Sequence, residues 1–145
     1  DGLNNLNQDV NSVVIAGMGF MTIKTILEAN IDLVKKLDQV IVSTHTQVVS
    51  LRKWIMEKAY LIEDEVMVYE NNKFYTIISF NPKNNLTYKE SDYLISKILI
   101  DKKDNIYLEY LKERLSKLVE INKYQNSDKL AFEIEKINLT LKRSE

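Results

Sequence analysis

The sequence predicts an α/β protein in which a parallel sheet ends in an antiparallel hairpin and is followed by an α-helical coiled-coil hairpin. Two short apolar runs each precede a helical segment with one apolar face, and consecutive strand–helix units form parallel sheets through right-handed crossovers. Two β-rich runs then flank an Asn-Asn pair, which favours a tight hairpin turn. Further along the chain, leucines recur at alternating short spacings, which is the pattern of a coiled coil.

The first strand is expected over residues 12–17, an apolar run that ends at a glycine. Because its apolar residues do not alternate with polar ones, the run is typical of a parallel strand buried on both faces. A helix is expected from about Phe20 to Leu37, with Asn30 as a candidate interruption. A loop that brings the backbone close to a ligand belongs in this region, since all three glycines of the chain fall within the first 19 residues.

The second strand–helix unit leads into the hairpin. Val40 to Val42 is expected to form a short buried strand, and Thr46 is placed to cap a helix that ends near Lys58. Residues 61–69 and 74–80 are rich in residues that favour strands, and the Asn-Asn pair between them tolerates positive φ angles. We therefore expect the first two strands to be parallel and the last two to be antiparallel.

The C-terminal part is expected to be a separate helical domain. A polar stretch from Pro82, the only proline, to about Lys89 predicts a linker, which divides the chain into domains at 1–82 and 83–145. Ser127 follows a polar break and is placed to cap a final helix, so the last two helices should fold back on each other as an antiparallel pair. The expected seam consists of Leu108, Leu111, Leu115 and Leu118 in one helix and of Leu130, Ile134, Ile137 and Leu141 in the other.

Composition excludes several classes of protein. With no cysteine and one histidine, the chain cannot form disulfides or thiolate zinc sites, and we expect no metal. It has no apolar run near the roughly 20 residues of a membrane span and no signal-peptide pattern, which favours a cytoplasmic protein without a membrane partner. Residues 83–145 carry 13 basic and 11 acidic side chains, an excess compatible with RNA contact but too small to predict it alone. The composition does not determine the oligomeric state.

Short stretches along nearly the whole chain match one bacterial enzyme family. The matching residues are Asp1-Gly2-Leu3, Asp9-Val10, Val13 to Gly19, Ile23, Ile26-Leu27, Val40 to Val42, Arg52, Trp54, Tyr60, Ile62, Glu65 and Lys73-Phe74-Tyr75. In this order they resemble the TrmK-like tRNA (adenine(22)-N(1))-methyltransferases, which are class I methyltransferases that use S-adenosylmethionine. The resemblance implies that residues 1–82 are the C-terminal part of a Rossmann-like methyltransferase sheet, and that the family's N-terminal part is not represented in this sequence.

The resemblance also implies a binding site for S-adenosylmethionine. Asp1 would accept a hydrogen bond from the adenine amine of the cofactor, while Gly2 and Leu3 would lie against the adenine. Ala16 and Gly17 would approach the cofactor near its sulfonium. Without the resemblance, Asp1 could equally be an exposed chain end. Because the family's first cofactor loop is not represented, these residues are expected to hold only part of the cofactor.

The loop after the first strand is implied to form the floor of the transfer site, through Gly17, Met18 and Gly19. It lies at the carboxyl end of its strand, where open α/β sheets bind ligands, although a simple strand-to-helix turn would use the same glycines. Methyl transfer to adenine N1 depends mainly on positioning, so no Ser or Cys nucleophile is required. Phe20 could pack on the target base or begin the core of the next helix.

Three residues are expected to bind the tRNA substrate. His45 follows the second strand at the same edge and could bind the target base or a phosphate, or be only a polar loop residue. Arg52 could reach a phosphate, or form a surface ion pair with Glu57 or Glu63. Tyr75 lies in the hairpin segment that resembles the family.

Some residues depart from the family's pattern. Ser43-Thr44-His45 stands where the family usually has Gln-Pro-Asn, Phe20 stands in place of a glycine, and Thr76 in place of an acidic residue. We interpret the sequence as that of an enzyme that methylates N1 of adenine 22 in tRNA. The alternative is a catalytically degenerate relative that acts as an RNA- or protein-binding module.

Overall fold

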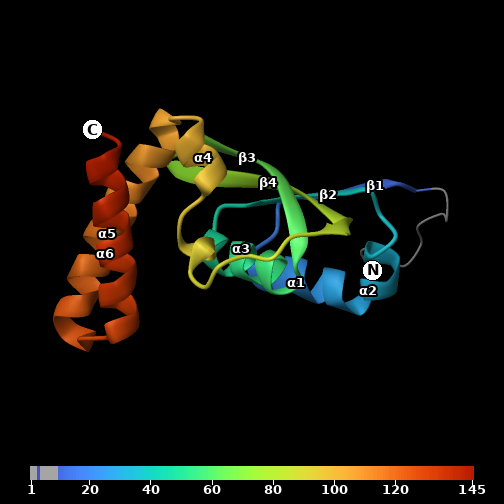
Figure 1. Ribbon diagram of the computed structural model, residues 1–145, viewed down its shortest axis with the longest axis horizontal. Helices are drawn as coiled ribbons and strands as arrows, with labels where there is room; N and C mark the ends of the chain where they lie inside the picture. Colours follow the sequence, from blue (N-terminus) through green and yellow to red (C-terminus); the bar gives the residue numbers. More distant parts are fainter. Residues whose placement is uncertain (1–2, 4–9) are drawn as a thin grey trace. The chain divides into compact units, whose positions relative to one another are not determined.

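The computed structural model describes residue 3 and residues 10–145, which form two compact units (Figure 1). The first unit ends at Tyr93 and the second runs from Leu94 to Glu145. The sequence suggested a boundary after Pro82. The segment 83–93 instead belongs to the first unit, because strand β4 continues to Asn85 and the residues after it are hydrogen-bonded to the sheet.

The first unit is built on a mixed four-stranded sheet in the order β1-β2-β4-β3. Its strands are β1 (Ser12–Ile15), β2 (Gln39–Thr44), β3 (Tyr60–Glu70) and β4 (Lys73–Asn85). β1 and β2 are parallel and β3 and β4 are antiparallel, as the sequence predicts. β4 is also paired antiparallel with β2. Asn71 and Asn72 have φ angles of 52° and 63°, the positive values that a tight hairpin turn requires.

Three helices of the first unit lie against one face of this sheet (Figure 1). They are α1 (Phe20–Ala29), α2 (Ile31–Val34) and α3 (Val48–Glu57). The break between α1 and α2 at Asn30 confirms the expected interruption. The side chains between the helices and the sheet are fully buried, and they include Ile23, Leu27, Val34, Val40, Val42, Leu51, Ile55, Ile78 and Phe80.

Two expectations about the first unit are wrong. The N-cap of α3 is Gln47, in the left-handed region at φ 50°, and not Thr46. Thr46 instead donates its backbone N–H to the hydroxyl of Thr44 at 3.1 Å, a turn that reverses the chain before the helix. Strand β1 is buried on one face only: Val13 and Ile15 face the helices, whereas Val14 is 66% exposed.

The segment after β4 is held to the sheet by Tyr88. Its hydroxyl accepts the backbone N–H of Ile62 at 3.0 Å and donates to the carbonyl of Tyr60 at 2.7 Å. Burial raises the pKa of Tyr88, so the phenol stays protonated and keeps its donor role. This segment is therefore ordered against the sheet and does not act as a free linker.

The second unit is helical. It contains α4 (Lys97–Asp101), α5 (Asn105–Gln125) and α6 (Asp128–Arg143), after a 3₁₀ turn at Asp92–Leu94. α5 continues through the polar stretch in which the sequence suggested a break, and the side chain of Ser127 caps α6 by accepting the N–H of Leu130, as predicted.

α5 and α6 pack against each other as a helical hairpin (Figure 1). Leu111, Leu118 and Ile137 are buried between them, and an ion pair joins Arg114 to Glu133. Burial by itself lowers the pKa of Arg114, but its contacts with Glu133 and Tyr110 outweigh that effect and raise it. The contact shows that the two helices pair, and coiled-coil packing of their side chains stays a prediction.

In the part of the chain that the structure describes, no helix is long and apolar enough to cross a membrane. The same residues contain no cluster of three or more His, Cys, Asp or Glu side chains that could hold a metal ion.

Candidate functional site

The loop between β1 and α1 exposes its backbone. Gly17 has a φ of +76°, a conformation that favours glycine, and a Cβ added there would meet no atom within 4 Å. Ala16, Gly17 and Met18 are exposed, and Met18 is 39% accessible. The loop therefore presents open backbone beside an exposed apolar side chain, at the carboxyl end of a parallel strand.

The loop between β2 and α3 lies beside it. A Cβ added to Gly19, the N-cap of α1, would come to 3.4 Å from the hydroxyl oxygen of Thr46. Both loops leave the carboxyl ends of adjacent parallel strands, so they meet at one edge of the sheet. Sequence reasoning assigned Thr46 only to a helix cap and missed its place between the two loops.

His45 and Tyr75 form an aromatic pair at the same edge. Their ring centroids are 5.3 Å apart, with the planes inclined by 52°. The antiparallel register pairs Thr44 with Thr76, which sets Tyr75 beside the loop that carries His45. His45 is exposed and Tyr75 half-buried, so the pair offers an accessible aromatic surface. Gly17, Met18, Gly19, His45 and Tyr75 thus all lie at this edge.

Other sequence-predicted residues lie elsewhere or cannot be placed. Asp1 and Gly2 are outside the described residues, and Leu3 is only 5% exposed. Phe20 is buried at the start of α1, which supports its role as a core residue over contact with a base.

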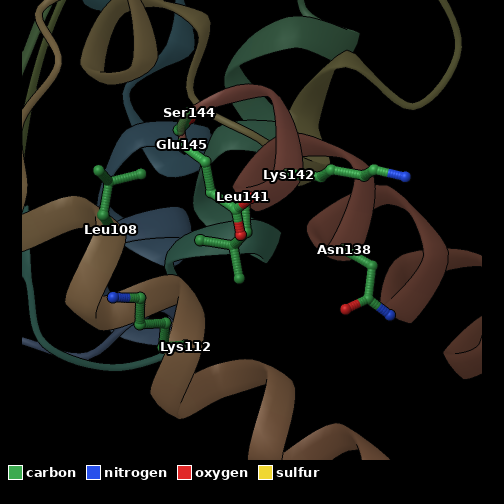
Figure 2. A pocket seen from close by; sticks show the side chains of 7 residues that line it. All are labelled: Leu108, Lys112, Asn138, Leu141, Lys142, Ser144 and Glu145. Carbon is green, nitrogen blue, oxygen red and sulfur yellow. The ribbon is translucent and has the colours of Figure 1, made fainter.

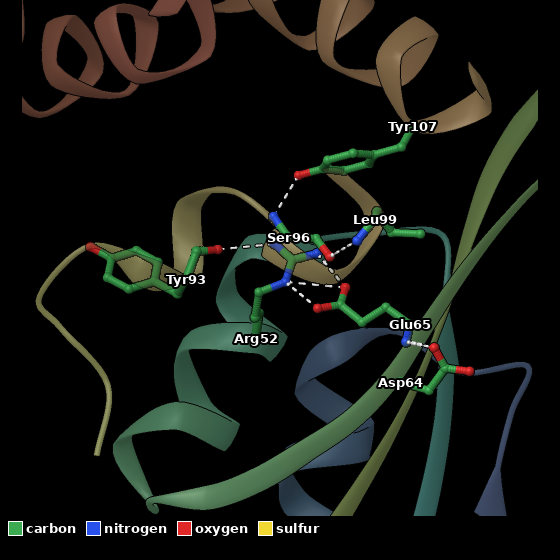
Figure 3. A network of polar contacts seen from close by, with 7 residues as sticks. All are labelled: Arg52, Asp64, Glu65, Tyr93, Ser96, Leu99 and Tyr107. Carbon is green, nitrogen blue, oxygen red and sulfur yellow. Dashed lines mark hydrogen bonds and ion pairs between the residues drawn. The ribbon is translucent and has the colours of Figure 1, made fainter. Parts of the chain in front are cut away.

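Arg52 is buried within the first unit, and its guanidinium is paired there (Figure 3). Its side chain is 1% exposed and pairs with Glu65, which is 2% exposed, at 2.9 Å. Its Nε also donates to the same carboxylate, and Nη1 donates to the carbonyl of Tyr93 at 3.0 Å. Arg52 therefore joins α3, β3 and the end of the first unit, and its partner is neither Glu57 nor Glu63.

Further hydrogen bonds order the start of the second unit (Figure 3). The hydroxyl of Tyr107 accepts the N–H of Ser96 at 2.8 Å, and the hydroxyl of Ser96 accepts the N–H of Leu99 at 3.1 Å. These bonds fix α4 against the beginning of α5. They involve no residue that the sequence assigned to the site.

The second unit also has a hollow of about 680 Å³ between the N-terminal half of α5 and the end of α6 (Figure 2). None of the sequence-predicted site residues lines it. Its lining consists of Leu108, Lys112, Asn138, Leu141, Lys142, Ser144 and Glu145.

Comparison with known proteins assigns the chain to a family. The family model described as TrmK, tRNA (adenine(22)-N(1))-methyltransferase, matches residues 1–145. The chain belongs to this family. Among curated proteins, the tRNA (adenine(22)-N(1))-methyltransferase of Bacillus subtilis is 32% identical over 79 residues, which cover 54% of this chain and 33% of that protein.

Solved structures share the fold. A Streptococcus pneumoniae structure in complex with S-adenosyl-L-methionine matches with a TM-score of 0.84 and 22% identity, covering 97% of this chain and 65% of that one. A structure of M. capricolum TrmK in complex with the cofactor product S-adenosyl-homocysteine matches with a TM-score of 0.73 and 26% identity. That match covers 99% of this chain and 66% of the other. The chain thus spans less than two thirds of the length of these TrmK relatives.

Proposed function

We propose that the protein carries out S-adenosylmethionine-dependent methylation of N1 of adenine 22 in tRNA. The observation that carries the proposal is the match of the whole chain to the TrmK family, combined with two adjacent loops at the carboxyl edge of parallel strands. Open α/β sheets bind ligands at this edge, and the glycines of the first loop permit close approach to the backbone.

The residues at this edge fit S-adenosylmethionine as the cofactor. Ala16 and Gly17 are exposed, and the space beside Gly17 is open, so backbone groups there can approach a bound ligand. The relatives crystallised with the cofactor or its product support this choice. The cofactor supplies an electrophilic methyl group, and the chain's residues orient the group and limit its access to water.

The tRNA substrate would bring its target adenine to the same edge. An adenine must leave its stack before an enzyme can reach N1, and the unstacked base needs a surface to pack on. Met18 and the His45–Tyr75 pair provide such a surface. Positioning of N1 in line with the methyl group then accounts for most of the catalysis, without a covalent intermediate. We place this reaction in the cytoplasm and expect the α5–α6 hairpin to contribute to tRNA binding.

The proposal is tested with tRNA transcripts, S-adenosylmethionine and a form of the protein that spans the full length of its TrmK relatives, followed by mass spectrometry of the nucleosides. We expect N1-methyladenosine above a control without enzyme. Gly17→Val should abolish formation of N1-methyladenosine, because its side chain fills the open space. Gly17→Asn should abolish it too, and because asparagine tolerates the positive φ, backbone strain would not explain that loss. His45→Ala should reduce the rate less, because the family usually has a different residue there.

Two outcomes would contradict the proposal. Wild-type protein that binds tRNA but forms no N1-methyladenosine would favour the non-catalytic RNA-binding module. Full activity in both Gly17 variants, with unchanged circular dichroism spectra, would show that the transfer site is not in this loop.

A further inference from the structure

One exposed to half-buried strip of α6 is formed by basic and apolar residues only. Residues spaced by three, four and seven positions lie on one side of an α-helix, and such a series runs along α6 from its first turn to its last residue. Phe132 and Leu139 in this series are 47% and 43% exposed. We call this series the α6 strip, and it consists of Lys129, Phe132, Lys136, Leu139 and Arg143.

The three cations of the strip have no carboxylate partner among the described residues, since no ion pair within 4.0 Å involves them. Lys136 lies over the ring of Phe132, with its Nζ 5.6 Å from the ring centroid. Lys136 makes that ring contact without an ion pair to a carboxylate. The strip therefore combines positive potential with exposed apolar surface.

The lysines of α5 are in a different electrostatic situation. Lys112, Lys117 and Lys123 each form an ion pair with a glutamate three or four residues earlier on the same helix. These pairs are exposed and weak, but they place a negative charge beside each positive one. Of the two long helices, only α6 presents a series of three cations that form no ion pair among the described residues.

The acidic residues of α6 lie off the strip. Glu133 is buried and paired with Arg114, and Asp128 and Glu135 lie on the neighbouring exposed side together with Lys142. The hollow at the end of the hairpin is lined from α6 by Asn138, Leu141 and Lys142, which also lie outside the strip. The strip is therefore a surface distinct from that hollow.

We infer that the α6 strip is the surface through which the helical hairpin contacts the phosphate backbone of RNA. This inference rests on the proposed tRNA substrate and assigns the contact to one side of one helix. Successive cations of the strip are seven residues apart, which corresponds to about 10 Å at a rise of about 1.5 Å per residue. Three separate phosphates can therefore be bound along one face of the RNA. Phe132 and Leu139 would pack against riboses or an unstacked base between those phosphates.

Charge complementarity favours RNA over a second copy of the chain as the occupant. Self-association through this strip would bring two sets of three like charges together with no acidic residue in the strip to neutralise them. The apolar contribution is limited to two partly exposed side chains. A polyanion neutralises the cations and releases its own counterions, which is the main source of affinity in such contacts.

The test compares two triple variants that remove the same charge from the same hairpin. The strip variant carries Lys129→Ala, Lys136→Ala and Arg143→Ala. The control variant carries Lys112→Ala, Lys117→Ala and Lys123→Ala, on α5. Affinity for an unmodified tRNA transcript is measured by fluorescence anisotropy between 50 and 300 mM salt, and circular dichroism and sedimentation check folding and oligomeric state.

We expect the strip variant to lose about tenfold or more in affinity near 100 mM salt, and its salt slope to fall by about 2–3, since each phosphate contact contributes about 0.7–0.9. The control variant should change affinity less than threefold. Phe132→Ser should weaken binding without changing the slope, because it removes no charge.

The inference is overturned if both triple variants bind tRNA equally well, or if the strip variant changes oligomeric state and leaves RNA affinity intact. Its failure can be told apart from failure of the proposed function. Wild-type protein that binds and methylates tRNA, with no difference between the variants, contradicts only the strip. Wild-type protein that does not bind tRNA contradicts both.

Discussion

Arg52 is a buried cation whose role is structural. It pairs with Glu65 on β3 and holds the carbonyl of Tyr93, so its charge is satisfied inside the first unit. We expect Arg52→Ala to lower the free energy of unfolding by about 3–5 kcal/mol, because it leaves the Glu65 carboxylate buried without its counter-charge. The double variant Arg52→Met with Glu65→Leu should recover most of that loss, since apolar replacement of a buried pair is often neutral.

Urea unfolding followed by the fluorescence of Trp54, the only tryptophan, measures these changes. Lys53→Ala is the matched control at the next, half-exposed position, and it should change the unfolding free energy by about 0.5 kcal/mol or less. If Arg52→Ala kept the wild-type midpoint and weakened tRNA binding instead, the sequence-based interpretation of Arg52 as a phosphate ligand would be favoured.

α5 and α6 are joined by apolar contacts and by the ion pair between Arg114 and Glu133. Because Glu133 is 9% exposed, Glu133→Ala should destabilise the protein by about 1.5–3 kcal/mol, the range for hydrogen bonds to charged groups. Glu120→Ala removes an exposed partner of Lys123 and should cost about 0.5 kcal/mol or less. A double-mutant cycle with Arg114→Ala isolates the pair, and a coupling energy near zero would mean that apolar packing alone joins the helices.

The sheet of the first unit has one face without helices from that unit (Figure 1). Val14, Val66 and Val68 are exposed there, and β1 is an edge strand. We expect the polypeptide of residues 1–145 to bind a hydrophobic dye and to self-associate at micromolar concentrations, because exposed apolar sheets with open edges do so. Changing the three valines to Thr should reduce both effects in fluorescence and sedimentation experiments. A monomer without dye binding would show that this face is covered.

Local patterns in the sequence were sufficient to predict the elements and several of their ends. The Asn71-Asn72 turn, the cap at Ser127, the break at Asn30 and the pairing of the helical hairpin all depend on residues close together in the chain or on a regular apolar period. Backbone hydrogen bonding and side-chain spacing act within a few residues, so a single sequence carries this information. The family motif also placed the glycine loop at the edge where His45 and Tyr75 now meet.

Only the tertiary structure decided which side chains are free to act. The sequence allowed Arg52 to be a phosphate ligand. In the folded chain, Glu65, 13 residues later, is hydrogen-bonded to its guanidinium. The apolar neighbours of Val14 predicted a strand buried on both faces, yet Val14 is exposed because no helix of the first unit covers its face of the sheet. In the same way, the cations of the α6 strip differ from those of α5 through the charges placed around them. Burial and electrostatic pairing depend on what packs from distant parts of the chain, and a local pattern does not contain that information.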